Sequence, residues 1–169
     1  MKKLLSLLVL TGTLFAQANN VFTLNPSVNS SAMGNVGIAH ADVKNVFHNP
    51  AFAGLNKRHQ EISYVDWLPN LTDDMGYQSI LYTSDMGWSS EIFYFNYGTQ
   101  VEADQGGIII GDFESSSYRV SGGYGFGIGD WLFGARLNLY NHNFIDSFDV
   151  DMNYGFDLGA YKEFGNTSL

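Results

Sequence analysis

The sequence has no cysteine, only three prolines among its 169 residues, and only 15% charged residues. Without cysteine the chain can form no disulfides, and it cannot be lipid-anchored through a cysteine after export. The charged fraction lies well below the roughly 25% that is usual in soluble domains. The composition therefore argues against an ordinary water-soluble domain stabilised by disulfides.

Positive charge is the scarcest kind. Eight Lys and Arg residues stand against 17 Asp and Glu residues, which gives a formal net charge of −9. Two of the eight, Lys2 and Lys3, belong to a predicted leader, and without them six basic residues remain and the net charge becomes −11. Binding to a phosphate backbone requires Lys and Arg, so we expect no nucleic-acid partner.

No apolar run is long enough for a transmembrane helix. The run at residues 4–15 has about 12 residues, whereas a helix needs about 20 to cross a bilayer. It follows Lys2 and Lys3 and precedes the small-residue pattern of Ala16 to Ala18, which predicts a signal peptide at residues 1–18, with a buried N-terminal helix as the alternative. An exported chain of this kind could lie in a membrane only as strands.

Glycine and aromatic residues are abundant instead, with 19 Gly, 10 Tyr and 13 Phe. This mixture is typical of β-barrels. Residues 19–60 are rich in Asn, Ser, Ala and Gly and contain Pro26 and Pro50, so they predict an irregular plug segment with one short helix, lying before or inside a barrel. Residues 61–169 are expected to form the barrel strands.

A period of two dominates the second part of the chain and predicts strands at residues 117–128, 131–142 and 152–164. Their apolar faces are Tyr118, Val120, Gly122, Tyr124, Phe126 and Ile128; Trp131, Phe133, Ala135, Leu137 and Leu139; and Met152, Tyr154, Phe156, Leu158 and Ala160. Small or polar residues alternate with them. The lengths suit tilted membrane strands, which need about 9–11 residues, better than a soluble β-sandwich, the alternative.

Earlier strands are expected at residues 61–68, 76–84 and 88–100, with a short one at 108–113. Glu91 interrupts an apolar face formed with Phe93, Phe95 and Tyr97, so we expect it near a membrane surface or a loop. The tight turn at residues 127–130 and the longer polar loop at 143–151 match periplasmic turns and external loops. Aromatic girdles at the membrane surfaces are expected from Tyr118, Trp131, Tyr140 and Tyr161.

Residues 31–51 contain a pattern of small residues followed by Asn-Pro-Ala. The pattern resembles the N-terminal signature of the PorV/PorQ family, within the FadL-like group of outer-membrane barrels. The signature positions are Ala32, Met33, Gly34, Gly37, Ala39, Asp42, Asn49, Pro50 and Ala51. Residues 62–77 resemble the first strands of PorV, and residues 155–161 resemble a later family strand, so the resemblance covers roughly residues 22–164.

The resemblance implies an all-β fold, an antiparallel transmembrane barrel of fourteen strands, of which this chain would be the N-terminal half. It also implies a function in type IX secretion at the outer membrane of a Gram-negative cell. There the protein would bind secreted cargo or surface-attachment partners and contact outer-membrane lipid. A FadL-like channel for hydrophobic small molecules is the alternative, and a soluble secreted adhesin is a third hypothesis.

We expect no catalytic, cofactor or metal site. The spacing of His40, Asp42 and His48 follows no known ligand pattern. Asp149, Asp151 and Asn153 lack the Gly and the distal Glu of a calcium loop, and no Ser/His/Asp arrangement has a supporting context. The glycines at 122–129 alternate with aromatic residues inside a strand, so packing or barrel curvature explains them better than a phosphate loop does.

Two arginines remain as candidates for a site. Arg119 and Arg136 lie on the polar faces of adjacent predicted strands, so both could point into a barrel lumen. The structural interpretation is that they pair with lumen carboxylates such as Asp157. The functional interpretation is that they contact a passing anion or the plug.

Overall fold

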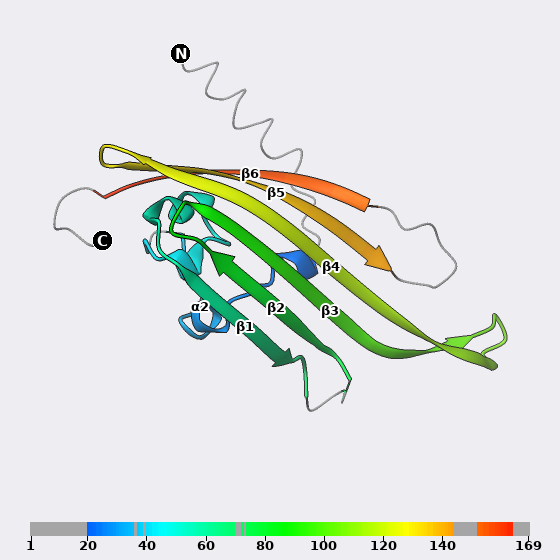
Figure 1. Cartoon of the computed structure of the whole chain (residues 1–169). Coiled ribbons are helices and arrows are strands. Elements are labelled where there is room, and N and C mark those ends of the chain that lie inside the picture. The colour runs from blue at the N-terminus through cyan, green and yellow to red at the C-terminus, as the bar shows by residue number, and fades with distance from the viewer. Residues whose placement is uncertain are drawn as a thin grey trace, which may run out of the picture.

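A computed structural model describes residues 20–35, 37–38, 40–69, 72, 74–143 and 152–163. They form one antiparallel six-stranded sheet in the order β1 to β6, with each strand beside its neighbours in the sequence (Figure 1). The strands are β1 His59–Asp66, β2 Gly76–Thr83, β3 Trp88–Ala103, β4 Ile109–Ile128, β5 Trp131–Asn143 and β6 Met152–Lys162. The all-β antiparallel prediction is therefore confirmed. The predicted signal peptide and most of the predicted loop at 143–151 lie outside the described residues.

The two ends of the sheet differ in the length of their connections. At one end, residues 84–87 and the pair Gly129–Asp130 make tight turns, with Gly87 and Gly129 in the left-handed region at φ 84° and 59°. At the other end lie residues 67–75, the tip of the β3–β4 hairpin and the connection from β5 to β6. Among the described residues β1 and β6 do not pair with each other, so the sheet is open and has two free edges.

Two strands are longer than the sequence predicts. β3 has 16 residues and β4 has 20. The expectation of a separate short strand at 108–113 was wrong, because residues 109–113 are the beginning of β4. The pairing of β3 with β4 is interrupted by two register shifts, one between Asn96 and Thr99 and one between Glu102 and Ala103. Such bulges let a strand bend without ending.

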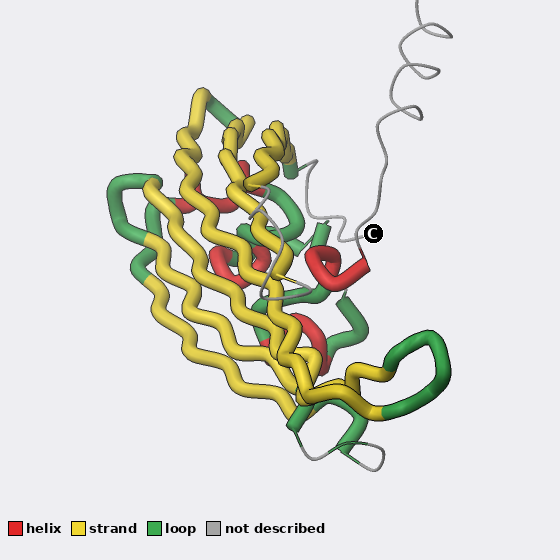
Figure 2. The backbone as a smooth tube through the Cα atoms, turned by 90° about the vertical axis from the view of Figure 1, so that its right-hand side faces the viewer, coloured by secondary structure: helices red, strands yellow, loops and turns green. Residues whose placement is uncertain are grey.

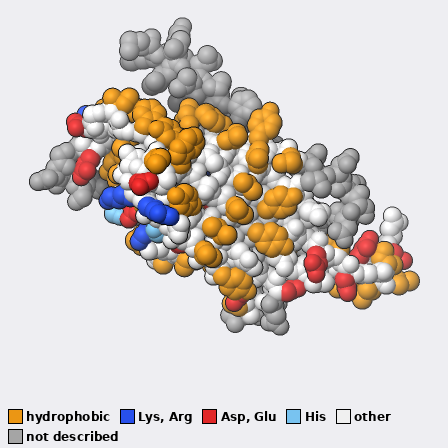
Figure 3. All heavy atoms as spheres, in the orientation of Figure 1, with side chains coloured by type: hydrophobic (Ala, Val, Ile, Leu, Met, Phe, Trp, Pro, Cys, Tyr) orange, Lys and Arg blue, Asp and Glu red, His pale blue; other side chains and the backbone are white. Residues whose placement is uncertain are grey.

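Side chains of one parity point away from the rest of the molecule and form apolar rows across the sheet. One row crosses all six strands through direct register partners: Ile62, Ile80, Ile92, Val120, Leu139 and Tyr154. All six are exposed; Ile92, on a central strand, is 52% exposed. In the space-filling view apolar side chains are spread over this outer face of the sheet (Figure 3).

Aromatic residues border this row on both sides. Towards the long connections lie Tyr64, Tyr94 and Tyr118. Towards the tight turns lie Trp88 paired with Tyr124, Phe126 paired with Phe133, and Trp131 paired with Ile128. The apolar faces predicted for β4, β5 and β6 are thus the outer face of the sheet.

On the inner face of the sheet the structure differs from the predictions made for Glu91, Tyr140 and Tyr161. Glu91 is not near a surface or in a loop: it points inward and is 3% exposed. Phe93 and Phe95 lie on the same inner face and are buried. Tyr140 and Tyr161 do not belong to an outer aromatic girdle, since their rings pack against Phe22 and Phe52 of the N-terminal segment. Strand alternation sorts side chains into two sets, but here both sets of β3 are apolar, so the pattern could not say which set faces inward.

Residues 20–55, called the inner segment from here on, lie against the inner face, and the sheet curves around them (Figure 2). They contain one five-residue α-helix, α2 Val28–Ala32, and three 3-10 helices: η1 Asn20–Thr23, η2 Val43–Asn45 and η3 Pro50–Leu55. The irregular segment expected here therefore carries more short helices than the one predicted. Most of its close packing is between η3 and the strands β4, β5 and β6.

Candidate functional site

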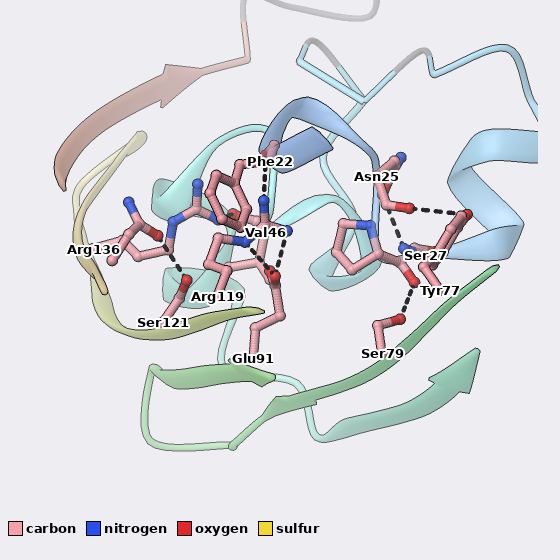
Figure 4. A network of polar contacts seen from close by, with 12 residues as sticks. Phe22, Asn25, Ser27, Val46, Tyr77, Ser79, Glu91, Arg119, Ser121 and Arg136 are labelled. Carbon is pink, nitrogen blue, oxygen red and sulfur yellow. Dashed lines mark hydrogen bonds and ion pairs between the residues drawn. The ribbon is translucent and has the colours of Figure 1, made fainter. Parts of the chain in front are cut away.

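The candidate site is the inner face of the sheet together with the inner segment that covers it. At the β1–β2 side, Ser27 caps the start of α2, since its Oγ accepts a hydrogen bond from Ser30 N at 3.2 Å. The same Oγ donates to the carboxylate of Glu61 on β1 at 3.0 Å. On β2, Ser79 Oγ donates to the carbonyl of Pro26 at 2.5 Å (Figure 4). The inner segment is thus bonded to the first two strands through polar side chains.

Arg119 on β4 is the most deeply buried charged residue among those described, with 1% of its surface exposed. Its Nε and Nη2 donate to Glu91 Oε1 on β3 at 2.8 and 2.5 Å. Its Nη1 donates to the carbonyl oxygen of Phe22 in the inner segment (Figure 4). The guanidinium therefore joins two neighbouring strands to the backbone of η1.

Arg136 on β5 makes a second, more open connection. Its Nε and Nη2 donate to Asp157 Oδ2 on β6 at 3.0 and 2.7 Å, and its Nη1 donates to the carbonyl of Val46 at 3.3 Å. Asn138 Nδ2 donates to the same carboxylate oxygen at 2.7 Å. The structure thus places Arg119, Arg136 and Asp157 on the inner face. It pairs Arg136 with Asp157, while Arg119 pairs with Glu91.

The sequence did not reveal that Phe47 links the two arginines. The guanidinium carbons of Arg119 and Arg136 lie 4.6 and 5.2 Å from the centroid of the Phe47 ring, and that of Arg119 lies 4.9 Å from the ring of Phe93. A cation over an aromatic face is attracted by the ring quadrupole. Strand register could have indicated Glu91, which lies on the strand beside Arg119, but Phe22 and Phe47 lie outside the strands and only the tertiary structure reveals their contacts.

The Asn-Pro-Ala part of the signature starts η3. Asn49 caps the helix, with its Oδ1 accepting from Ala51 N at 3.0 Å, and Pro50 occupies the first turn, where its missing N–H is not needed. Asn49 Nδ2 also donates to the carbonyl of Ala160 on β6 at 3.2 Å. The helix that these residues begin packs on β4, β5 and β6.

Three inward-facing glycines that are register partners form the surface, called the glycine row, on which η3 is seated. Gly125, Gly134 and Gly159 are direct partners on β4, β5 and β6. A Cβ added at Gly134 would overlap the backbone of Pro50 and Ala51, and one at Gly159 would overlap Asn49 Oδ1. The glycine-rich strands thus allow the backbone of η3 to approach the sheet closely.

We expect Gly134→Val to displace η3 and to destabilise the protein by about 1–3 kcal/mol or more, since a backbone cannot move aside as a side chain can. The measurement is the free energy of unfolding together with limited proteolysis of residues 40–58. Gly122→Val is the matched control: Gly122 lies on β4, faces outward and has nothing within 4 Å of an added Cβ. Equal effects of the two substitutions would show that η3 is not seated on the glycine row.

The other signature residues lie at caps and turns of the inner segment. Asp42 caps η2 through a bond from Lys44 N at 3.0 Å, Ala32 ends α2, Met33 is its C-cap, and Gly34 adopts φ 77°. Gly37 lies so close to the His48 ring that a Cβ would overlap it. Ala39 lies outside the described residues. The signature positions that the structure describes therefore shape the turns of the inner segment.

His48 makes a partly buried polar contact within the inner segment. Its Nε2 lies 3.0 Å from Asn25 Nδ2. Burial, and secondarily the positive charge of Arg136, hold the pKa of His48 below its usual value. Since the unfolded chain takes up the proton more readily, we expect the free energy of unfolding to decrease as the pH falls below the ordinary histidine pKa of about 6.5, which urea titration at several pH values would measure. Among the described residues no three His, Cys, Asp or Glu side chains group as metal ligands.

An open cavity of about 520 Å³ lies beside the two arginines. Its lining combines polar residues with apolar ones: His48, Arg119, Arg136, Asn138, Tyr140 and Asp157 beside Phe22, Phe47, Pro50, Phe156 and Leu158. Arg119 and Arg136 are already paired with Glu91 and Asp157, so the cavity presents paired charges together with apolar side chains to a molecule inside it.

Comparison of the chain with protein-family models, with curated proteins and with solved structures finds no match. In the part of the chain that the structure describes, no helix combines the length and the apolarity required to cross a bilayer. The fold and the site define an antiparallel β-sheet protein with an apolar outer face and with an inner face of mixed polar and apolar side chains that the inner segment covers.

Proposed function

We propose that this chain is part of an outer-membrane β-barrel that acts in type IX protein secretion by binding secreted cargo or surface-attachment partners. In this proposal the inner segment is the plug of the barrel. The observation that carries the proposal is the apolar row from Ile62 to Tyr154, which crosses all six strands between two sets of aromatic residues.

Lipid is the medium that suits this outer face. The row of exposed apolar side chains is continuous across six adjacent strands, and a contiguous exposed apolar surface marks a contact with a membrane or a partner. Aromatic girdles at both edges of an apolar band are typical of outer-membrane barrels, and residues 118–128 of β4 match the about 9–11 residues of a tilted membrane strand. The free edges of β1 and β6 must be paired in lipid, so the proposal requires further strands between them.

The connections supply a direction for the proposed barrel. Tight turns in outer-membrane barrels face the periplasm and long loops face the cell exterior. By this rule residues 84–87 and 129–130 lie on the periplasmic side. The β1–β2 connection and the tip of the β3–β4 hairpin then lie outside the cell.

The secretion role follows from the resemblance at residues 31–51, and the inner face is consistent with it. A FadL-like channel for hydrophobic molecules would need an apolar passage. Here two arginines, an aspartate and other polar groups lie in the lining beside Phe22, Phe47 and Phe156, so the cavity is not apolar throughout. Binding to polar protein segments is therefore favoured over passage of apolar solutes.

Tryptophan quenching tests the membrane position. Trp88 and Trp131 lie on the outer face, whereas Trp67 packs against Tyr77 and Phe95 inside. In vesicles of phospholipid brominated on the acyl chains, we expect strong quenching of a Trp67→Phe variant, which keeps the two outer tryptophans. A Trp88→Phe/Trp131→Phe variant should be quenched much less. A mature protein that stays in the supernatant of pelleted membranes, with no quenching, would contradict the membrane assignment.

The role within the membrane needs a second measurement. Purification from the outer membrane should recover secreted proteins bound to the chain, and their secretion should fail when the gene is deleted. A protein that purifies alone and admits small apolar solutes into vesicles would instead support the FadL-like alternative.

A further inference from the structure

β3 and β4 continue together beyond the rest of the sheet as a two-stranded arm, defined as residues 97–114 (Figure 1). β2 pairs with β3 only as far as Asn96, and β5 pairs with β4 only from Ser116. Among the described residues the arm is therefore a hairpin whose two outer edges have no strand partner. It projects from the end of the sheet that carries the long connections.

Hydrogen bonds hold the arm at its base and at its tip. At the base, Asp74 accepts a bond from Thr99 N at 2.7 Å, and Gly98 takes the left-handed φ of 75° that the bend requires. At the tip, Asp104 Oδ1 accepts from the backbone N–H groups of Gly106 and Ile108 at 2.8 and 2.9 Å. An arm organised in this way loses little conformational entropy when it binds a partner.

The surface of the arm is apolar at its tip and carries only negative charge. Ile108, Ile109 and Ile110 are each at least 60% exposed, and Val101 is exposed too. The charged residues of the arm are Glu102, Asp104, Asp112 and Glu114, with no Lys, Arg or His. The space-filling view shows apolar and acidic side chains together at this end (Figure 3).

We propose that the arm is a docking surface for an extended protein segment that carries both basic and apolar side chains. The exposed apolar side chains favour a partner with apolar side chains that would bury them. The acidic side chains favour a partner with basic side chains, and the unpartnered strand edges can hydrogen-bond with an extended backbone. Anionic lipid is repelled by the same charges, and a second copy of this acidic chain is repelled as well. The inference rests on the proposed function in one respect, namely that this end of the sheet faces the cell exterior.

Binding of designed peptides to the full chain in detergent tests this surface. The probe is a fluorescent peptide of alternating Lys and Val, followed by anisotropy. We expect it to bind wild type, and to bind about tenfold more weakly to Glu102→Gln/Asp112→Asn/Glu114→Gln, which leaves the Asp104 turn intact. Ile109→Ser/Ile110→Ser should weaken binding by a similar factor. The matched controls lie at the tight-turn end: Asp85→Asn/Asp130→Asn and Met86→Ser should bind like wild type.

Three results would overturn the docking surface. The first is that the arm variants bind the Lys-Val peptide as wild type does, and the second is that a Lys-Ser peptide binds as tightly as the Lys-Val peptide. The third is that the main effect of the arm variants is a loss of binding to anionic vesicles. Membrane fractionation separates the two proposals. An arm that binds as expected on a chain absent from the membrane would refute the barrel alone. A membrane-embedded chain whose arm variants bind normally would refute the docking surface alone.

Discussion

Replacing Arg119 by Met is expected to destabilise the protein by about 3–5 kcal/mol, because it leaves the carboxylate of Glu91 buried without its cation. Arg119 and Glu91 have side-chain exposures of 2% and 3%, so the Glu91 carboxylate has little contact with solvent once the guanidinium is lost. The substitution also removes the hydrogen bond to the Phe22 carbonyl and the contacts with the rings of Phe47 and Phe93. The measurement is the free energy of unfolding from urea titration of the protein in phospholipid vesicles.

The second arginine supplies the comparison for this prediction. Asp157, the partner of Arg136, has a side chain that is 42% exposed, so solvent screens it when the pair is broken. Arg136→Met should therefore cost about 1 kcal/mol or less from its ion pair. The double variant Arg119→Met/Glu91→Leu removes both buried charges and should recover most of the loss of Arg119→Met. A loss for Arg119→Met no larger than that for Arg136→Met would show that Glu91 is not buried as described.

An arginine in place of Ile92 is expected to cost about 2–4 kcal/mol of assembly in the membrane, the penalty for a cation on the lipid face near the bilayer midplane. Ile92 lies in the row that crosses the sheet, between Tyr94 on one side and Trp88 on the other. In a water-soluble protein the same substitution at a half-exposed position would change stability by only about 0.5 kcal/mol or less. The fraction of chain recovered in the outer membrane and the urea midpoint in vesicles both report the difference.

The arm provides the matched control for this substitution. Ile109 is the same residue type, is 68% exposed and lies outside the proposed bilayer. Ile109→Arg should leave membrane assembly unchanged. If Ile92→Arg and Ile109→Arg behaved alike, with neither affecting assembly, the outer face would be in contact with water and the membrane assignment would fail.

Strand positions could largely be predicted from the sequence. Alternation over residues 117–128 and 131–142 is a local property, because successive side chains on a strand point to opposite faces whatever lies beside them. The start of β5 at Trp131 and the two-residue turn before it agree with the prediction. The joining of residues 108–113 into β4 could not be predicted, since the continuation depends on pairing with β3 through two register shifts.

The contacts of the inner face could be predicted from the sequence to a much smaller extent. Glu91 was placed near a surface because its neighbours Phe93 and Phe95 resembled a lipid-facing set. Only its position next to β4 shows that Arg119 is its partner. The seat of η3 is a similar case, since Gly125, Gly134 and Gly159 become a single feature only when three strands are in register.

The sequence by itself determined where the chain alternates and which side chains share a face, because the pleat of a strand follows from local backbone geometry. Only the tertiary structure decided which face is covered by residues 20–55 and which ion pairs and glycines meet there. Those relations depend on strand register and on contacts between residues far apart in the chain, such as Phe22 with Arg119, 97 positions apart, and Asn49 with Ala160, 111 positions apart. No local pattern carries that information.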